Sequence, residues 1–169
     1  MRGFSTLFFL LIFPALVFSQ SPATTPTPPP MQYGPSINLK EARRALDAAE
    51  KEATREGWPV AIAIVDTAGF MVAFVKLDNT QLGSVEVSIQ KARTSALYRR
   101  ATKEFEDRLT LGGSNLKVLS LPGLPIEGGV PIVVDGKIVG AIGVSGVQST
   151  QDAQVAIAGA NALISIAKK

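Results

Sequence analysis

The sequence of 169 residues contains no cysteine and no histidine. Without cysteine, no disulfide can form and no thiol is present to act as a nucleophile or a metal ligand. Without histidine, the sequence lacks the commonest general base and the commonest metal ligand in proteins. A catalytic site of the Ser-His-Asp or Cys-His type is therefore excluded, and a structural zinc site would lack both of its usual ligands.

The sequence also has little excess charge of either sign, with a formal net charge of +3. Nucleic-acid binding requires a concentrated basic patch. We therefore expect no nucleic-acid partner.

An apolar run near the N-terminus, residues 7–18, follows the basic residue Arg2. It is too short to span a bilayer core of roughly 30 Å. Val17 and Ser19 occupy the −3 and −1 positions of a cut after Ser19. The pattern predicts a signal peptide over residues 1–19, export to the periplasm or the extracellular space, and no stable membrane span after cleavage. The alternative is an uncleaved membrane anchor.

Residues 20–36 contain six of the eleven prolines. Such a segment favours extended polyproline conformations and cannot build a core. We predict a disordered proline-rich linker over 20–36 and a single folded domain over 37–169.

The pattern of apolar residues within 37–169 predicts both helices and strands. Two pairs of adjacent strands would form hairpins, so the sheet should be antiparallel, with helices covering it. The alternation of strand and helix needed for a doubly wound parallel sheet is absent, and the fold class is α+β. The expected elements are a helix from a cap at Asn38 to a stop at Gly57, strands 60–66 and 70–77, one long or broken helix over 84–109, a loop over 111–125, strands 130–134 and 137–145, and a helix from Ser149.

Glycines are frequent between residues 126 and 146, and three roles compete for them. Their spacing fits no phosphate-binding loop. Gly140 and Gly143 lie inside a strand, where glycine allows a neighbouring element to approach closely. Gly128 and Gly129, after Glu127, would leave backbone amides open to a ligand. Glu127 has the alternative role of a solvated loop residue.

The helix beginning at Ser84 has a face rich in hydroxyl groups, with a lysine in its middle. This face could offer hydrogen-bond donors and cations to a carboxylated ligand. The alternative is a solvated or subunit-facing surface. The residues on this face are Ser84, Ser88, Lys91, Ser95, Tyr98 and Thr102.

Four segments occur in an order that identifies a family resemblance: VAIAIVDTAGFMVAFVKLD, GSVEVSIQKARTSALYRRATKEFE, LPIEGGVPIVVDGKIVGAIGVSG and QDAQVA. Together they resemble the GlcG/HbpS-type heme-binding family, also called heme-degrading, over residues 37–167. The resemblance implies an antiparallel sheet flanked by helices in a profilin-like layout, and homo-oligomers. It also implies exported members that bind heme, and members that take part in redox sensing.

Heme would need an apolar slot, cations for its two propionates and an axial ligand. Of the side chains present, Tyr98 is the best placed to ligate the iron, because tyrosinate can bind ferric heme. The alternatives are Tyr33, Met71, Met31 and a hydroxyl such as that of Thr94 or Thr102. The ligand-binding residues predicted on this basis are Lys91, Arg93, Thr94, Tyr98, Arg99, Arg100, Glu127, Gly128 and Gly129.

Three functions therefore compete at this stage. The first is an exported protein that binds heme or another tetrapyrrole, in heme handling or redox sensing. The second is a sensor or enzyme of the GlcG type for an organic acid. The third is a structural oligomer without a ligand. The residues show neither a reductant nor an oxygen site for heme breakdown, so we assign no catalytic residues.

Overall fold

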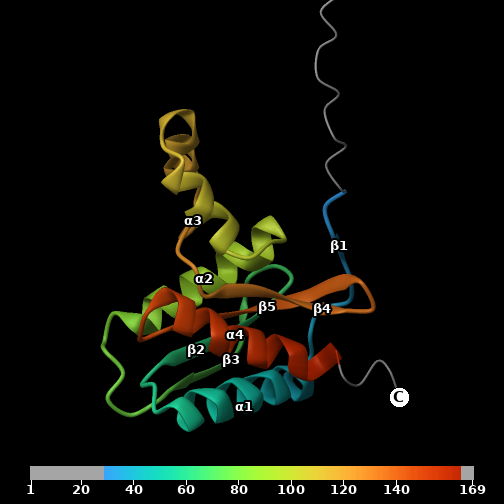
Figure 1. Ribbon diagram of the computed structural model, residues 1–169. Coiled ribbons are helices and arrows are strands. Elements are labelled where there is room, and N and C mark those ends of the chain that lie inside the picture. Colours follow the sequence, from blue (N-terminus) through green and yellow to red (C-terminus); the bar gives the residue numbers. More distant parts are fainter. Residues whose placement is uncertain (1–28, 165–169) are drawn as a thin grey trace, which may run out of the picture.

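The computed structural model describes residues 29–164 (Figure 1). The predicted signal peptide, residues 20–28 of the predicted linker and residues 165–169 lie outside the described residues. In chain order the elements are β1 (Gln32–Tyr33), α1 (Leu39–Glu56), β2 (Ala61–Asp66), β3 (Met71–Lys76), α2 (Ser84–Tyr98), α3 (Lys103–Thr110), the 3-10 helix η1 (Gly113–Ser120), β4 (Gly129–Val134), β5 (Lys137–Ser145) and α4 (Ser149–Ile164).

The sheet is mixed rather than purely antiparallel. Strand β5 pairs antiparallel with β4 on one side and with β2 on the other, and β3 pairs antiparallel with β2. Strand β1 pairs parallel with the start of β5, at Lys137 and Ile138. The α+β class is confirmed, and the one parallel strand corrects the predicted sheet.

The parallel strand comes from the predicted linker, whose last residues are part of the fold. The amide of Gly34 donates to the carbonyl of Ile138 at 2.8 Å. The hydroxyl of Tyr33 donates to the carbonyls of Ala96 at 2.8 Å and Leu97 at 3.2 Å. Tyr33 thus bonds two carbonyls in the last turn of α2, where helical hydrogen bonds run out. The Ala96 carbonyl also accepts from the Arg99 amide at 3.4 Å. The proline content of this segment indicates neither the backbone pairing with β5 nor the bonds of the Tyr33 side chain.

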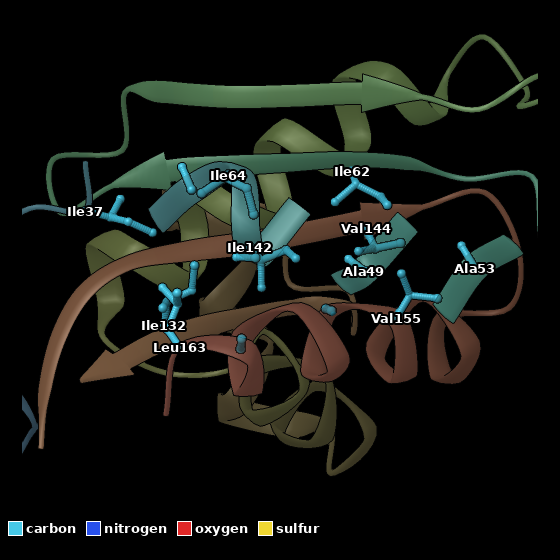
Figure 2. Packing of buried hydrophobic residues seen from close by; sticks show 14 of the residues in the cluster. Ile37, Ala49, Ala53, Ile62, Ile64, Ile132, Ile142, Val144, Val155 and Leu163 are labelled. Carbon is cyan, nitrogen blue, oxygen red and sulfur yellow. The ribbon is translucent and has the colours of Figure 1, made fainter. Parts of the chain in front are cut away.

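Helices α1 and α4 cover one face of the sheet, and Figure 2 shows the core between them and the strands. Helix α1 begins as predicted: the side chain of Asn38 and that of Glu41 cap each other's backbone amides, and Gly57 ends the helix in the left-handed conformation. One stripe of α1 consists of small residues and is buried against the core. Its members are Ala42, Ala45, Ala49 and Ala53.

Helix α2 covers the opposite face of the sheet and lies unusually close to β5. A side-chain carbon at Gly143 would lie 2.1 Å from the carbonyl oxygen of Ser88 and 2.4 Å from the amide nitrogen of Ala92. At Gly140 it would lie 2.4 Å from the carbonyl oxygen of Val65. The predicted structural role of these two glycines, which is to admit neighbouring backbone, is confirmed.

The predicted helix over 84–109 is broken at Arg99, which ends α2 with a φ of 57°. After the break, α3 and the 3-10 helix η1 form an arm (residues 103–120) that projects away from the sheet (Figure 1). A loop was expected where η1 lies. Within residues 29–164, no helix has both the length and the apolar character needed to cross a membrane.

Candidate functional site

The hydroxyl-bearing face of α2 points into the protein, not toward a ligand. Ser84, Ser88 and Ser95 are each at most 1% exposed, and Lys91 is equally buried. The Lys91 ammonium donates to the carboxylate of Asp152 at 2.8 Å and to the carbonyl of Val144 at 3.0 Å. A ligand carboxylate could reach Lys91 only by displacing these partners.

The predicted slot beside Gly128 and Gly129 is filled by the protein's own atoms. A side-chain carbon at Gly128 would lie 2.8 Å from the Lys91 ammonium, and one at Gly129 would lie 2.4 Å from the Lys91 carbonyl oxygen. The Gly129 amide is not open either, because it donates to the hydroxyl of Thr102 at 2.9 Å. In this structure the paired glycines admit α2, and the expectation that they expose amides to a ligand is not met.

A groove of about 250 Å³ lies on the outer side of α2, between this helix and the loop over residues 121–125. The α2 side chains that line it recur at steps of three, one and three residues, so they form one stripe of the helix. The lining residues are Gln90, Arg93, Thr94, Leu97, Pro122 and Gly123.

Two of the predicted site residues hold the loop against α2. The Thr94 hydroxyl accepts from the amide of Leu124 at 2.8 Å and donates to the carbonyl of Gln90 at 2.8 Å. The Tyr98 hydroxyl donates to the carbonyl of Pro122 at 2.9 Å. Gly123 has a φ of 148°, and a side-chain carbon there would lie 2.8 Å from the Thr94 hydroxyl. Thr94 and Tyr98 therefore hold the loop that forms one wall of the groove, although Tyr98 itself does not line it.

Arg93 is the basic residue among those that line the groove. It is exposed and makes no ion pair or hydrogen bond with any residue that the structure describes. Beside it, Leu97 is 50% exposed, and both side chains lie against the turn at Gly69. An unpaired guanidinium next to exposed apolar surface suits a ligand that has both a carboxylate and a flat apolar part.

Of the other predicted cations, Arg99 and Arg100 lie at the end of α2 and already have partners. The guanidinium of Arg99 lies 5.5 Å from the ring centroid of Tyr33. Arg100 forms an ion pair with Glu104 at 3.7 Å and lies 5.5 Å from the ring centroid of Phe105. Neither residue lines the groove.

Glu127 is half-buried, and its amide donates to the Glu106 carboxylate. It does not line the groove. The structure thus brings together Arg93, Thr94 and Tyr98 but leaves the other predicted site residues apart.

Larger hollows exist elsewhere, but their linings are less suited to a ligand. One of about 570 Å³ lies over a single face of α1, between Asp47 and Arg55, and so has no opposing wall. Another of about 430 Å³ lies between the segment 35–41 and the β4–β5 hairpin. Its lining has one cation, Lys137, and two carboxylates, Asp135 and Glu41, a balance of charge that disfavours a carboxylated ligand. We therefore favour the α2 groove.

The groove fits the organic part of heme better than it fits the iron. No cluster of acidic side chains that could hold a metal ion occurs within the described residues. The Tyr98 hydroxyl is engaged with Pro122, and the Thr94 hydroxyl both donates and accepts. Tyr98 could bind iron as tyrosinate only by losing the proton that it donates to Pro122, and Thr94 is held by two hydrogen bonds. Arg93 and Leu97 have no such partners to give up.

Sequence reasoning missed Gln90, Leu97, Pro122 and Gly123 in the groove lining. The spacing of Gln90, Arg93, Thr94 and Leu97 was visible as a helical stripe, although nothing in the sequence alone showed which loop would face it. Asp152 was also missed as the partner of Lys91.

Comparison with known proteins gives a family match over most of the chain. The family model described as "Haem degrading protein HbpS-like" matches residues 37–161. Protein GlcG of Escherichia coli strain K12 is 42% identical over 109 residues, which are 64% of this chain and 81% of GlcG.

Solved structures agree with the family match. The crystal structure of a double mutant of HbpS from Streptomyces reticuli superimposes with a TM-score of 0.71 at 28% identity, covering 84% of this chain and 99% of that one. The crystal structure of a complex between PduOC and heme superimposes with a TM-score of 0.68 at 25% identity, covering 75% of this chain and 94% of that one.

Proposed function

The chain belongs to the HbpS-like family, and on that premise we propose that it binds heme or a related tetrapyrrole in the groove beside α2. The observation that carries the proposal is the exposed, unpaired Arg93 next to the apolar surface of Leu97 and Pro122. The heme complex of the structural relative PduOC supports the ligand class.

In this proposal Arg93 binds a propionate, and the macrocycle lies on the apolar wall that Thr94 and Tyr98 hold in place. When bound, heme would supply an iron centre, but the hydroxyls at the groove, those of Thr94 and Tyr98, are already engaged in hydrogen bonds. Binding therefore depends mainly on the propionate and on apolar contact. Tyr98 as an axial ligand stays a prediction, as does a wider role in heme handling or redox sensing.

We expect the purified protein to bind hemin and iron-free protoporphyrin IX with affinities within about threefold of each other, because both offer the same ring and propionates. Arg93→Gln should lower the affinity for each of the two ligands by about fivefold, which corresponds to about 1 kcal/mol for a partly exposed charge pair. The two affinities are measured by titration, followed by Soret absorbance for hemin and by fluorescence for the porphyrin. Arg44→Gln, which removes an exposed arginine from α1 on the opposite face of the sheet, should leave both unchanged.

The outcomes separate the competing functions. Strong hemin binding without porphyrin binding, lost in Tyr98→Phe, would replace the iron-independent mode by axial ligation. Equal losses of affinity in Arg93→Gln and Arg44→Gln would show that the groove is not the binding site.

The organic-acid sensor or enzyme would be favoured by a different result. In that case neither tetrapyrrole binds, and an organic acid gives a specific thermal shift that Arg93→Gln abolishes. No response to any of them would favour a structural oligomer.

We also propose that the protein is exported, on the basis of the apolar run and the Val17/Ser19 pattern near the N-terminus. Expression of the full chain in a bacterial host should give a product whose N-terminal residue is Gln20, recovered outside the cytoplasm. Mass spectrometry of the fractionated protein measures this. An intact N-terminus on protein held in the membrane fraction would instead indicate the uncleaved anchor.

A further inference from the structure

An open hollow of about 290 Å³ lies where α1 ends, beside the segment that leaves β3 (Figure 1). Its two walls come from parts of the chain that the sheet brings together, since Ala61 at the start of β2 pairs with Lys76 at the end of β3. The pairing extends one step further, where the Leu77 amide donates to the Val60 carbonyl at 3.0 Å. The side chains that line the hollow include Thr54, Trp58, Pro59, Leu77, Asp78 and Asn79.

Trp58 is the one tryptophan of the sequence, and it is only half-buried. It packs against the core and also lines the hollow. Its indole N–H has no hydrogen-bond partner among the described residues, and it is not buried either. A tryptophan that serves packing alone usually pairs its N–H. Trp58 therefore offers a flat apolar surface and a donor to the hollow.

The backbone around Trp58 is already ordered. Its amide donates to the Ala53 carbonyl at 2.9 Å, past Gly57 in the left-handed conformation, which is a common way for a helix to end. Pro59 then restricts the backbone of the residue before it. A ligand on this side chain would pay little of the entropic cost of ordering the chain.

The polar side chains around the ring are exposed and have no partner. The opposite wall is a turn that the Thr80 hydroxyl closes by donating to the Leu77 carbonyl at 2.7 Å. Asp78 and Asn79 lie in this turn, and Thr54 lies on the α1 side. All three are exposed, and none of their side chains forms a hydrogen bond or an ion pair with any part of the chain that the structure describes.

The lining combines an aromatic surface with hydrogen-bond donors and acceptors. The Asn79 amide donates and accepts, the Thr54 hydroxyl does both, and the Asp78 carboxylate accepts. A sugar ring presents C–H groups on one face and hydroxyls, which donate and accept, around its edge. Ligand sites typically join an apolar aromatic wall to a few such polar groups. A simple cation would leave the donors unused, and a carboxylate would meet Asp78 in a lining without a cation.

We propose that this hollow binds a carbohydrate, with one sugar ring on Trp58 and its hydroxyls bonded by Asp78, Asn79 and Thr54. The volume is near the lower end of the range for ligand sites, about 300–1,000 Å³, which suits one ring of a neutral oligosaccharide. The inference does not rest on heme binding, because no residue lines both this hollow and the α2 groove.

Trp58 reports on its own site, because no other tryptophan contributes to the fluorescence. Cellotriose, maltotriose and tri-N-acetylchitotriose serve as probes, since they differ in linkage and in substituents. At millimolar concentrations we expect at least one of them to change the Trp58 emission saturably and to shield the ring from quenching by acrylamide. Glycerol at matched viscosity should do neither.

Two variants keep the reporter and each remove one polar group. Asp78→Ala removes a charged acceptor and should lower the affinity for the saccharide about tenfold, whereas Asn79→Gly removes an amide and should lower it about fivefold. Glycine accepts the φ of 62° found at position 79. Circular dichroism verifies that both variants fold.

Two further variants are controls. Asp47→Ala removes an exposed aspartate of α1 that does not line the hollow, and it should leave the affinity for the saccharide unchanged. Arg93→Gln, which alters the α2 groove, should also leave it unchanged. Since hemin and saccharide are titrated separately, failure of one proposal is distinguishable from failure of the other.

Four results would overturn the proposal. The first is that no probe changes the emission or the quenching of Trp58 saturably. The second is a saccharide affinity that Asp78→Ala and Asn79→Gly leave unchanged, or that Asp47→Ala lowers equally. The third is protection of Trp58 by tetramethylammonium chloride but by no saccharide, which would make the hollow a cation site. The fourth is loss of saccharide binding in Arg93→Gln, which would move the sugar to the α2 groove.

Discussion

Replacing Lys91 with methionine should lower the free energy of unfolding by about 3–5 kcal/mol, the usual cost of removing one member of a buried ion pair. The side chains of Lys91 and Asp152 are 2% and 3% exposed, and their charged atoms lie 2.8 Å apart. Methionine fills a similar volume but leaves the carboxylate without its counter-charge. Urea unfolding of the wild type and the variant at pH 7 measures the difference.

The stability that Lys91→Met loses relative to the wild type should become smaller as the pH is lowered. Burial raises the pKa of the Asp152 carboxyl, and the hydrogen bond and charge of Lys91 partly oppose this increase. Without Lys91, the folded-state pKa of Asp152 should rise further above its unfolded value. A carboxyl with a raised pKa contributes stability below its unfolded pKa, and this contribution is lost as the pH rises through the folded pKa. Lys91→Met should therefore be most destabilising at neutral pH and approach the wild type under acidic conditions.

Two controls separate the buried ion pair from charge in general. Lys103 forms an ion pair with Asp107 on α3, but its side chain is 48% exposed. Lys103→Met should cost less than about 1 kcal/mol. The double variant Lys91→Met/Asp152→Leu should recover much of the stability, because neither charge is then buried alone.

The same experiment tests the ligand role predicted for Lys91. A Lys91→Met variant as stable as the wild type, with weaker hemin binding, would contradict the structural role and support the ligand role. A loss of stability that does not depend on pH would contradict the part assigned to the charge of Asp152.

Local signals in the sequence predicted the order and bounds of most elements. The capping box at Asn38, the stop at Gly57 and the Asp135-Gly136 turn each require particular residues within a few positions. In the structure Asp135 and Gly136 have φ values of 50° and 74°, as the tight hairpin turn requires. Strand β5 has the predicted bounds, and α4 begins at the predicted Ser149.

The orientation of α2 could not be predicted from the same signals. A face bearing hydroxyls and a lysine was expected to meet a ligand, solvent or another subunit, yet it is buried. The Ser88 hydroxyl donates to the carbonyl of Val85 in its own helix, so burying this polar side chain leaves no unpaired donor. Lys91 finds its carboxylate 61 residues later in the chain, and no local pattern shows that pairing.

The candidate site could be predicted only in part, because it also depends on contacts between segments far apart in the sequence. Arg93, Thr94 and Tyr98 were named from one helix. In the structure Arg93 and Thr94 line the groove, and Tyr98 bonds the loop opposite them. The opposing loop follows the arm, and two hydrogen bonds with α2 hold it in place: the Leu124 amide donates to the Thr94 hydroxyl, and the Tyr98 hydroxyl donates to the Pro122 carbonyl. The sequence of the loop alone does not show these bonds. Whether these residues bind a ligand stays a prediction.

Gly143→Ala should be the most disruptive of the single-methyl additions to the sheet, lowering the free energy of unfolding by about 3 kcal/mol. The added carbon would lie 2.1 Å from the Ser88 carbonyl oxygen and 2.4 Å from the Ala92 amide nitrogen. Both atoms belong to the backbone of α2, so no side-chain rotation can relieve the overlap. The helix has to move away from β5 as a unit, which loosens Ala92 and Ala96 against the strands.

Thermal unfolding followed by circular dichroism should show a midpoint lower by about 10 °C in Gly143→Ala, given about 3 °C per kcal/mol for a domain of this size. Gly83→Ala is the matched control, because Gly83 has no atom within 4 Å of its added carbon and a φ of −63°. It should shift the midpoint by less than about 2 °C, since exposed substitutions without new contacts change stability little. The same methyl group would then be costly only where α2 contacts the sheet. Equal effects of the two substitutions would show that glycine at 143 is not needed for the close approach of α2, and the packing role of the strand glycines would have to be withdrawn.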